Sequence, residues 1–250
     1  MLKTRIIPVL LIQKSSIIKT INFKNARIVG DALSTAKVFS KRMADEMVIV
    51  DIDATKNTFI NFSLLERISK FCNMPLVLGG GITSLQDAER LFKSGADKII
   101  IDSEFYRNKN LINTLSKKYG SQSIVFSLDV KKVDGKYYGF SNSGNIFSNI
   151  NATEIAKQVE DLGAGEILLN NIDEDGKMNG FDLDLINNIS CITKVPVVAA
   201  GGCGSKLDCL NAINSGANAI AAGSIFFWVG ESIISIKKYL RQNDVNVRLS

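Results

Sequence analysis

The second half of this chain repeats part of the first, and that repeat limits the possible folds more than any other feature. Residues 75–106 align with residues 196–227 without a gap. The matched pairs include Pro75 with Pro196, Gly80-Gly81 with Gly201-Gly202, Ser84 with Ser205, Asp87 with Asp208, Ser94-Gly95-Ala96 with Ser215-Gly216-Ala217, and Ser103 with Ser224. Shorter matches lie upstream, where residues 46–53 align with 166–173 and residues 6–12 with 124–130. We therefore expect two fused halves of similar fold.

Short β-branched runs alternate with longer stretches of helical periodicity, the pattern of repeated βα units around a parallel sheet. The predicted strands are residues 5–12, 47–52, 75–79, 97–102, 123–129, 165–170, 195–200 and 218–222. The predicted helices are residues 33–43, 61–72, 85–94, 109–118, 152–162, 182–192, 205–215 and 231–241. Eight units in 250 residues predict an α/β fold. Specifically, we expect one (β/α)8 TIM barrel domain over residues 1–250, built from two fused half-barrels. A doubly wound sheet gives no reason for the symmetry and ranks behind it.

Two segments are longer than a minimal barrel requires, residues 13–32 after the first strand and 130–150 after the fifth. Both are expected to be loops on the face where barrel enzymes carry their sites. In the second, Asp134-Gly135 lies between apolar and aromatic residues, which predicts a tight hairpin.

Composition excludes several classes of function. The chain has no histidine, which removes serine-histidine and cysteine-histidine nucleophiles and histidine-based zinc sites. Its four cysteines form no CxxC pair, so we expect reduced thiols, a cytoplasmic location, no metal and no cofactor. The net charge of +5 is spread along the chain, which does not favour nucleic-acid binding. The apolar run near the N-terminus is too short to span a membrane and indicates a buried strand.

Glycine loops at matching positions of the two halves predict a pair of anion sites. In the first half, Gly81 follows the third strand and Ser103 the fourth; in the second half, Gly202 follows the seventh strand, and Gly223 and Ser224 follow the eighth. Glycines let a phosphate approach backbone N–H groups that lead into a helix. Two opposed sites imply a ligand with two phosphates, although the charge of Asp102 beside Ser103 opposes the first.

Acid and base chemistry must come from carboxylates, lysines or tyrosines. Asp51, Asp129 and Asp175 lie at or just beyond the predicted carboxyl ends of strands. In the repeat register Leu11 occupies the place of Asp129, so one acid remains where two would face each other. Asp129 follows an apolar strand, and burial can hold a proton on it near neutral pH. We assign it the catalytic role.

Four charged residues mark the opposite end of the predicted barrel, at or near the starts of strands. They are Arg5, Glu46, Lys98 and Glu166. Together they would form a neutral ring. The ring is either a solvated salt-bridge cluster or a gate that closes a pore through the barrel.

The whole chain resembles the HisF family, the cyclase subunits of imidazole glycerol phosphate synthase. The resemblance rests on Arg5-Ile6-Ile7-Pro8, Lys19, Gly30-Asp31, Asp45-Glu46, Asp51, Gly79 to Ile82, Gly95 to Lys98, Gly120 to Gln122, Leu162 to Ile167 and Asp173 to Gly176. It implies a HisH-type glutaminase docked at the bottom of the barrel and ammonia that crosses to a phosphorylated substrate at the top. It also implies that Arg5, Glu46, Lys98 and Glu166 form the ammonia gate, and that Lys19, Asp175 and Gly176 contribute to the substrate site.

The same resemblance shows departures at the top of the barrel. The two catalytic aspartates of the family correspond to Leu11 and Asp129, and its phosphate-site asparagine corresponds to Asp102. Leu10 to Lys14, Asn170 and Asp51 to Ala54 resemble HisF paralogues linked to acetamidino groups on surface sugars.

Three hypotheses follow. The first is a subunit that channels ammonia for amidine formation on a surface sugar. The second is a cyclase of histidine biosynthesis, which Leu11 opposes. The third is a scaffold that activates a glutaminase without catalysis of its own.

Overall fold

Eight parallel strands close into a barrel in the computed structural model, which describes residues 3–57 and 59–249. Each strand pairs with the next one around the ring, and β7 pairs with β10, while β12 pairs with β1 to close it. The barrel strands are β1 (Arg5–Gln13), β4 (Met47–Asp51), β5 (Leu76–Gly79), β6 (Lys98–Ile101), β7 (Ile124–Val133), β10 (Glu166–Asn171), β11 (Val197–Ala200) and β12 (Ala219–Ala222). The predicted (β/α)8 TIM barrel is confirmed.

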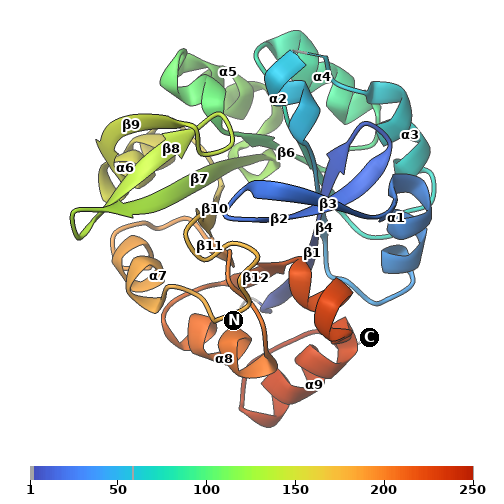
Figure 1. Cartoon of the computed structure of the whole chain (residues 1–250). Helices are drawn as coiled ribbons and strands as arrows, with labels where there is room; N and C mark the ends of the chain where they lie inside the picture. Colours follow the sequence, from blue (N-terminus) through green and yellow to red (C-terminus); the bar gives the residue numbers. More distant parts are fainter. Residues whose placement is uncertain (1–2, 58, 250) are drawn as a thin grey trace.

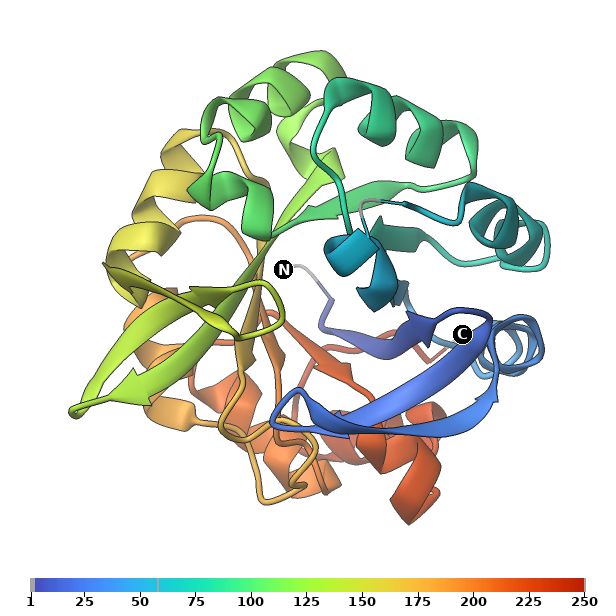
Figure 2. The same cartoon turned by 45° about the horizontal axis from the view of Figure 1, so that its top comes forward.

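One long helix follows each barrel strand, and these helices ring the barrel (Figure 2). They are α1 (Ala32–Ser40), α3 (Phe62–Ser69), α4 (Leu85–Lys93), α5 (Asn110–Tyr119), α6 (Ala152–Asp161), α7 (Leu183–Ser190), α8 (Lys206–Asn214) and α9 (Ile233–Gln242). Every predicted helix is present, with ends that differ by a few residues. Within the described part of the chain, no helix is long and apolar enough to cross a membrane.

The sequence repeat is also a structural repeat. The offset that carries residue 75 to residue 196 also carries β5 onto β11, α4 onto α8 and β6 onto β12, end for end. The caps match as well: Ser84 and Ser205 share an extended backbone conformation, and their hydroxyls accept the N–H groups of Asp87 and Asp208. The two segments therefore begin their helices in the same way.

Extra strands project from the end of the barrel where the parallel strands terminate, which we call the upper end. The loop predicted over residues 13–32 contains β2 (Ser16–Ile21) and β3 (Lys24–Asp31), which continue from β1 as an antiparallel hairpin (Figure 1). After β7, the strands β8 (Lys136–Ser141) and β9 (Ile146–Asn151) form a second antiparallel extension. The predicted turn at Asp134-Gly135 is confirmed, with positive φ at both residues.

Apolar side chains fill the barrel in layers. Alternate residues of the strands point inward and form a cluster separate from the core between strands and helices. The inner cluster is Ile7, Val48, Val77, Ile100, Val125, Leu168, Val198, Ala219 and Ala221, with Val9, Val50 and Ala200 at its edge. This column separates the lower end, where the parallel strands begin, from the upper end.

Candidate active site

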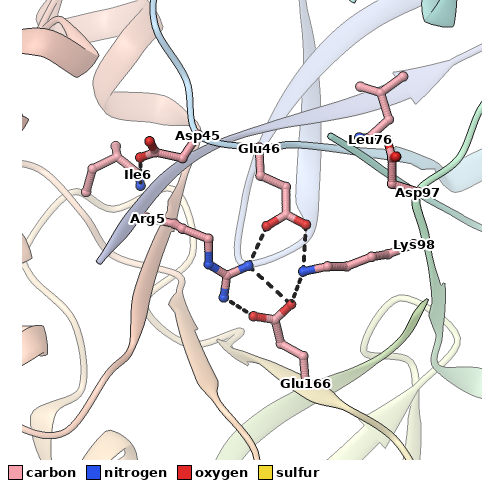
Figure 3. A network of polar contacts seen from close by, with 8 residues as sticks. All are labelled: Arg5, Ile6, Asp45, Glu46, Leu76, Asp97, Lys98 and Glu166. Carbon is pink, nitrogen blue, oxygen red and sulfur yellow. Dashed lines mark hydrogen bonds and ion pairs between the residues drawn. The ribbon is translucent and has the colours of Figure 1, made fainter. Parts of the chain in front are cut away.

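Four charged residues meet at the lower end of the barrel (Figure 3). Arg5 forms ion pairs with Glu46 and Glu166. Lys98 Nζ lies 2.8 Å from Glu46 Oε1 and 2.8 Å from Glu166 Oε2. Each cation therefore bridges both carboxylates, and the predicted ring exists as a closed cycle of four ion pairs.

Burial strengthens this ring, because only 2% of Glu46 and 5% of Glu166 is exposed. Burial raises the pKa of Glu166, but the hydrogen bonds and charges of Arg5 and Lys98 outweigh it and hold the pKa below its ordinary value. Burial lowers the pKa of Arg5, but the hydrogen bonds and charges of Glu166 and Glu46 outweigh burial and leave that pKa above its usual range. Both groups are therefore ionised at neutral pH, with their charges balanced inside the ring.

A second buried ion pair supports the lower end. Lys237 Nζ of α9 lies 2.7 Å from Asp45 Oδ1 and donates to the carbonyl oxygen of Met43 at 2.8 Å. The other oxygen of Asp45 accepts the N–H of Ile6 at 2.8 Å. The residue before Glu46 thus joins the last helix to the first strand, which fixes the segments that carry Arg5 and Glu46.

A cavity of about 210 Å³ occupies the upper end. It lies at the carboxyl ends of the strands, where barrel enzymes hold their substrates. Of the predicted substrate and catalytic residues, it gathers Lys19, Gly81, Ser103, Asp129, Asp175, Gly176, Gly202, Gly223 and Ser224. Leu11 also lines it.

Asp51 is the exception among the predicted residues, since it does not line the cavity. Its Oδ1 accepts the N–H groups of Asp53 at 3.1 Å and Ala54 at 3.2 Å, within the short helix α2 (Ile52–Asn57). The backbone oxygen of Asp51 would lie 2.0 Å from a Cβ atom at Gly80, whose φ is +103°. The structure thus uses Asp51 to cap α2 and requires glycine beside it.

Lys19 of β2 marks the second-half side of the cavity. Its ammonium group is buried and donates to the carbonyl oxygen of Val9 at 2.7 Å. A Cβ atom at Gly223 would lie 2.2 Å from Lys19 Nζ, so a side chain there would displace the ammonium group from this position. Burial lowers the pKa of Lys19 to about 8, against the charge of Asp175, which raises it. The group remains a cation at neutral pH and faces the loops of Gly223 and Ser224.

The β2–β3 hairpin holds Lys19 in place by packing on the loop after β10. Thr20 Oγ1 donates to Asp175 Oδ2 at 3.1 Å, and the N–H of Asn22 donates to the carbonyl oxygen of Asp175 at 2.9 Å. A Cβ atom at Gly176 would lie 2.0 Å from the carbonyl oxygen of Thr20. Asp175 and Gly176 therefore position the hairpin that carries Lys19, while both also line the cavity.

On the first-half side of the cavity, the polar groups form hydrogen bonds with one another. Ser103 Oγ donates to Asp102 Oδ2 at 2.8 Å and accepts the N–H of Asn142 at 2.9 Å. Asp102 lies directly after β6, and burial raises its pKa to about 7, although hydrogen bonds from Ser103 lower it. The second half lacks this carboxylate, because Gly223 precedes Ser224 where Asp102 precedes Ser103.

Asp129 of β7 lies beside Asp102, on the adjacent strand. Its Oδ1 accepts from Ser127 Oγ at 3.2 Å. Burial and the charge of Asp102 hold the pKa of Asp129 well above its ordinary value, while Ser127 and Asn170 lower it. Burial also raises the pKa of Tyr106, with the charges of both aspartates as further causes. A carboxyl group whose pKa is raised can act as a general acid, and its conjugate base can accept a proton.

Three polar residues that line the cavity are absent from the predicted site: Ser127, Asn142 and Asn170. Ser127 lies two positions before Asp129 on the same strand, so both face the barrel interior. Asn170 is opposite Asp129 in the pairing of β7 with β10. Alternation along strands could have identified both, whereas Asn142 approaches through the turn between β8 and β9, which no sequence pattern places over the cavity.

Known proteins match this chain over most or all of its length. The model of a family described as "Histidine biosynthesis protein" matches residues 5–230. The chain is 42% identical to the imidazole glycerol phosphate synthase subunit HisF of Hydrogenobaculum sp. (strain Y04AAS1), over 100% of both chains. It is 38% identical to a putative imidazole glycerol phosphate synthase subunit, hisF2, of Campylobacter jejuni, again over 100% of both chains. A putative subunit hisF3 of Vibrio vulnificus is 40% identical, over 92% of this chain and 90% of that protein.

Proposed function

This chain belongs to the histidine biosynthesis protein family and is a homologue of HisF subunits, and on that premise we propose that it is the barrel subunit of an ammonia-transferring synthase. A HisH-type glutaminase docks at the lower end and releases ammonia there. The ammonia crosses the barrel and reacts with a phosphorylated substrate in the upper cavity. The two together form a heterodimer.

One observation carries this proposal: a closed ring of charges and a cavity with glycine loops occupy opposite ends of one apolar column. From Arg5 to Leu11 the strand covers about 20 Å, at about 3.3 Å per residue. Ammonia is small and uncharged, so it can pass between apolar side chains that exclude ions. The ring would have to open for ammonia to enter the barrel.

In the cavity, the cationic and the acidic side chains have different roles. Lys19 and the loops of Gly202 and Ser224 bind phosphate through a cation and backbone N–H groups. Asp129 transfers a proton to or from the substrate when ammonia adds. The chemistry needs no cofactor in this scheme, since the nucleophile is the ammonia that the glutaminase provides.

Two acceptors fit the scheme. The names of the relatives favour the histidine-pathway reaction, imidazole glycerol phosphate synthesis, over amidine formation on a surface sugar. The cavity residues Leu11 and Asp102 favour the amidine, because the family has a carboxylate and an asparagine at these positions.

Turnover tests the proposal. The purified chain is supplied with an ammonium salt and the bisphosphorylated intermediate of histidine biosynthesis, beside a Leu11→Asp variant. Product from the natural chain supports the histidine-pathway reaction. Product from the variant alone supports a synthase whose natural acceptor differs. If neither protein forms product and a HisH-type glutaminase does not associate with the chain, the proposal is wrong.

A further inference from the structure

The two halves of the upper cavity carry opposite charge, although their backbones repeat. On the second-half side, the buried ammonium group of Lys19 contacts Gly223. On the first-half side, Asp102 occupies the matching region and lies beside Asp129. A phosphate gains energy from the cation and loses energy near the carboxylates. The symmetric backbone therefore does not offer two equivalent phosphate sites.

The first-half side also presents acceptors rather than donors. Within the described part of the chain, Asp102 Oδ1 is buried and has no hydrogen-bond partner. Asn170 Oδ1 is also buried without a partner, but it lies on the second-half side, 2.8 Å from the position of a Cβ atom at Gly201. The Ser103 hydroxyl, which could have donated to a phosphate, donates to Asp102 instead. A buried acceptor without a partner destabilises the empty site, so a ligand that donates a hydrogen bond to it is favoured.

Other charged groups on the first-half side do not change the sign of its net charge. Glu104 and Arg107 also line the cavity, and Arg107 is exposed. Their charges cancel, which leaves Asp102 and Asp129 to determine the local potential, with Asp175 further off on the second-half side. Tyr106, buried close to both aspartates, has a hydroxyl group without a hydrogen-bond partner in the described chain.

We propose that the cavity binds one phosphate, at the loops of Gly202 and Ser224, and that its first-half side binds a hydroxyl or amino group of the same substrate through Asp102. This inference rests on the proposed function only in taking the substrate to be phosphorylated. It defines the substrate class as a phosphate monoester whose other end carries hydrogen-bond donors, as in a sugar or amino-sugar phosphate.

Binding of inorganic phosphate tests the first part of this proposal. Backbone amide shifts are recorded by NMR at pH 8, where Asp102 is charged, as phosphate is added to the natural chain and to Asp102→Asn. In the natural chain we expect shifts at Gly202 and Ser224 and none at Gly81 and Ser103. In Asp102→Asn we expect both loops to shift, because asparagine is neutral and its amide can donate.

The matched control is Asp175→Asn, which removes a carboxylate from the other side of the cavity and should create no site at Gly81. Shifts at Gly81 and Ser103 in the natural chain would overturn the proposal. So would a lack of shifts at Gly202 and Ser224, or an Asp102→Asn variant that gains no second site. Lowering the pH from 8 to 6 should let phosphate reach Ser103 in the natural chain, because Asp102 is then protonated.

Sugar phosphates test the second part. Glucose 6-phosphate and glucosamine 6-phosphate should bind the natural chain at least about tenfold more tightly than inorganic phosphate, the effect of one well-made hydrogen bond to a charged group. Asp102→Asn should remove most of that gain while it leaves phosphate binding at Ser224 unchanged. The tighter sugar shows whether a hydroxyl or an amine is preferred. Affinities equal to that of phosphate would overturn this part.

These measurements require neither glutaminase nor ammonia. If the chain fails to transfer nitrogen but shows the expected phosphate pattern, the proposed function is wrong and the one-phosphate cavity stands. If it transfers nitrogen and the phosphate pattern fails, the reverse holds.

Discussion

The two ends of the barrel differ in whether their buried charges are paired. At the lower end, Arg5 and Lys98 bridge Glu46 and Glu166, so that every charge of the ring has two partners. At the upper end, Asp102 and Asp129 lie close together, and within the described part of the chain Asp102 Oδ1 is buried without a hydrogen-bond partner. The lower end is complete without a ligand, and the upper end is complete only with one. Ion pairs therefore balance the buried charges at the lower end, whereas a buried carboxylate oxygen at the upper end has no hydrogen-bond partner in the described chain.

The largest expected effect is on chemistry at the upper end. Asp129→Asn should lower ammonia-dependent product formation by about 100- to 10,000-fold, the usual contribution of a positioned acid or base. The change keeps the shape of the side chain and removes its proton transfer. Steady-state assays with an ammonium salt measure it, and Asp184→Asn, on the exposed surface of α7, is the control. Turnover that stays within twofold of the natural chain would remove Asp129 from the mechanism.

Removal of one lower-end carboxylate should cost stability. Glu166→Gln should lower the free energy of unfolding by about 3 kcal/mol at pH 7, because Arg5 and Lys98 then share one carboxylate. The pKa of Glu166 is held below its ordinary value, so its contribution is present above pH 4.5 and is lost as the pH falls through the folded-state pKa. Urea denaturation at pH 7 and at pH 3.5 measures the difference. Equal stability at pH 7 would show that the ring is not stabilising.

Opening the ring should reduce the use of ammonia from glutamine more than the use of free ammonium. Lys98→Met removes one cation from the ring, and glutamine-dependent turnover should fall several-fold relative to ammonium-dependent turnover, because ammonia escapes before it enters the barrel. Lys93→Met, at an exposed site that pairs with Glu89, is the matched control. The ratio of the two activities, measured with the HisH-type glutaminase present, is the readout. A ratio equal to that of the control would exclude a role for Lys98 in ammonia passage.

The smallest expected effect is an increase in stability, opposite to the loss expected for Glu166→Gln. Asp102→Asn should raise the free energy of unfolding by about 1 kcal/mol at pH 8, since it removes a charge that burial disfavours. Burial raises the pKa of Asp102 to about 7, so the natural chain loses stability as the pH rises from 4 through 7, and the variant should not. Thermal unfolding across this pH range would show it as a shift of about 2–4 °C. A destabilised variant at pH 8 would mean that the carboxylate is well accommodated.

The barrel itself could be predicted from the sequence because its signals are local. Strand runs, capping residues such as Ser84 and the repeat fix the order and type of the elements, and the structure confirms them. The lower ring was also predictable, since Arg5, Glu46, Lys98 and Glu166 all lie at strand starts, which meet at one end of a parallel barrel.

The upper end was harder to predict because its contacts are not local. The raised pKa of Asp129 depends on burial and on the charge of Asp102, which the pairing of β6 with β7 brings close, and no single sequence position reveals either cause. Residues 13–32 were expected to be a loop, and the β2–β3 hairpin that carries Lys19 forms because it packs on the loop around Asp175. Asp51 looked like a site residue by its position, but a short helix after β4 turns its carboxylate to backbone N–H groups.

Docking of a glutaminase at the lower end is tested most directly by hydrogen–deuterium exchange of the chain with and without a HisH-type glutaminase. We expect a one-to-one complex in which amides around Arg5, Glu46, Lys98 and Glu166 exchange more slowly, while those around Gly81 and Gly202 do not change. Protection of the upper loops, or exchange that is unchanged throughout, would contradict the claim that the lower end receives ammonia from a docked glutaminase.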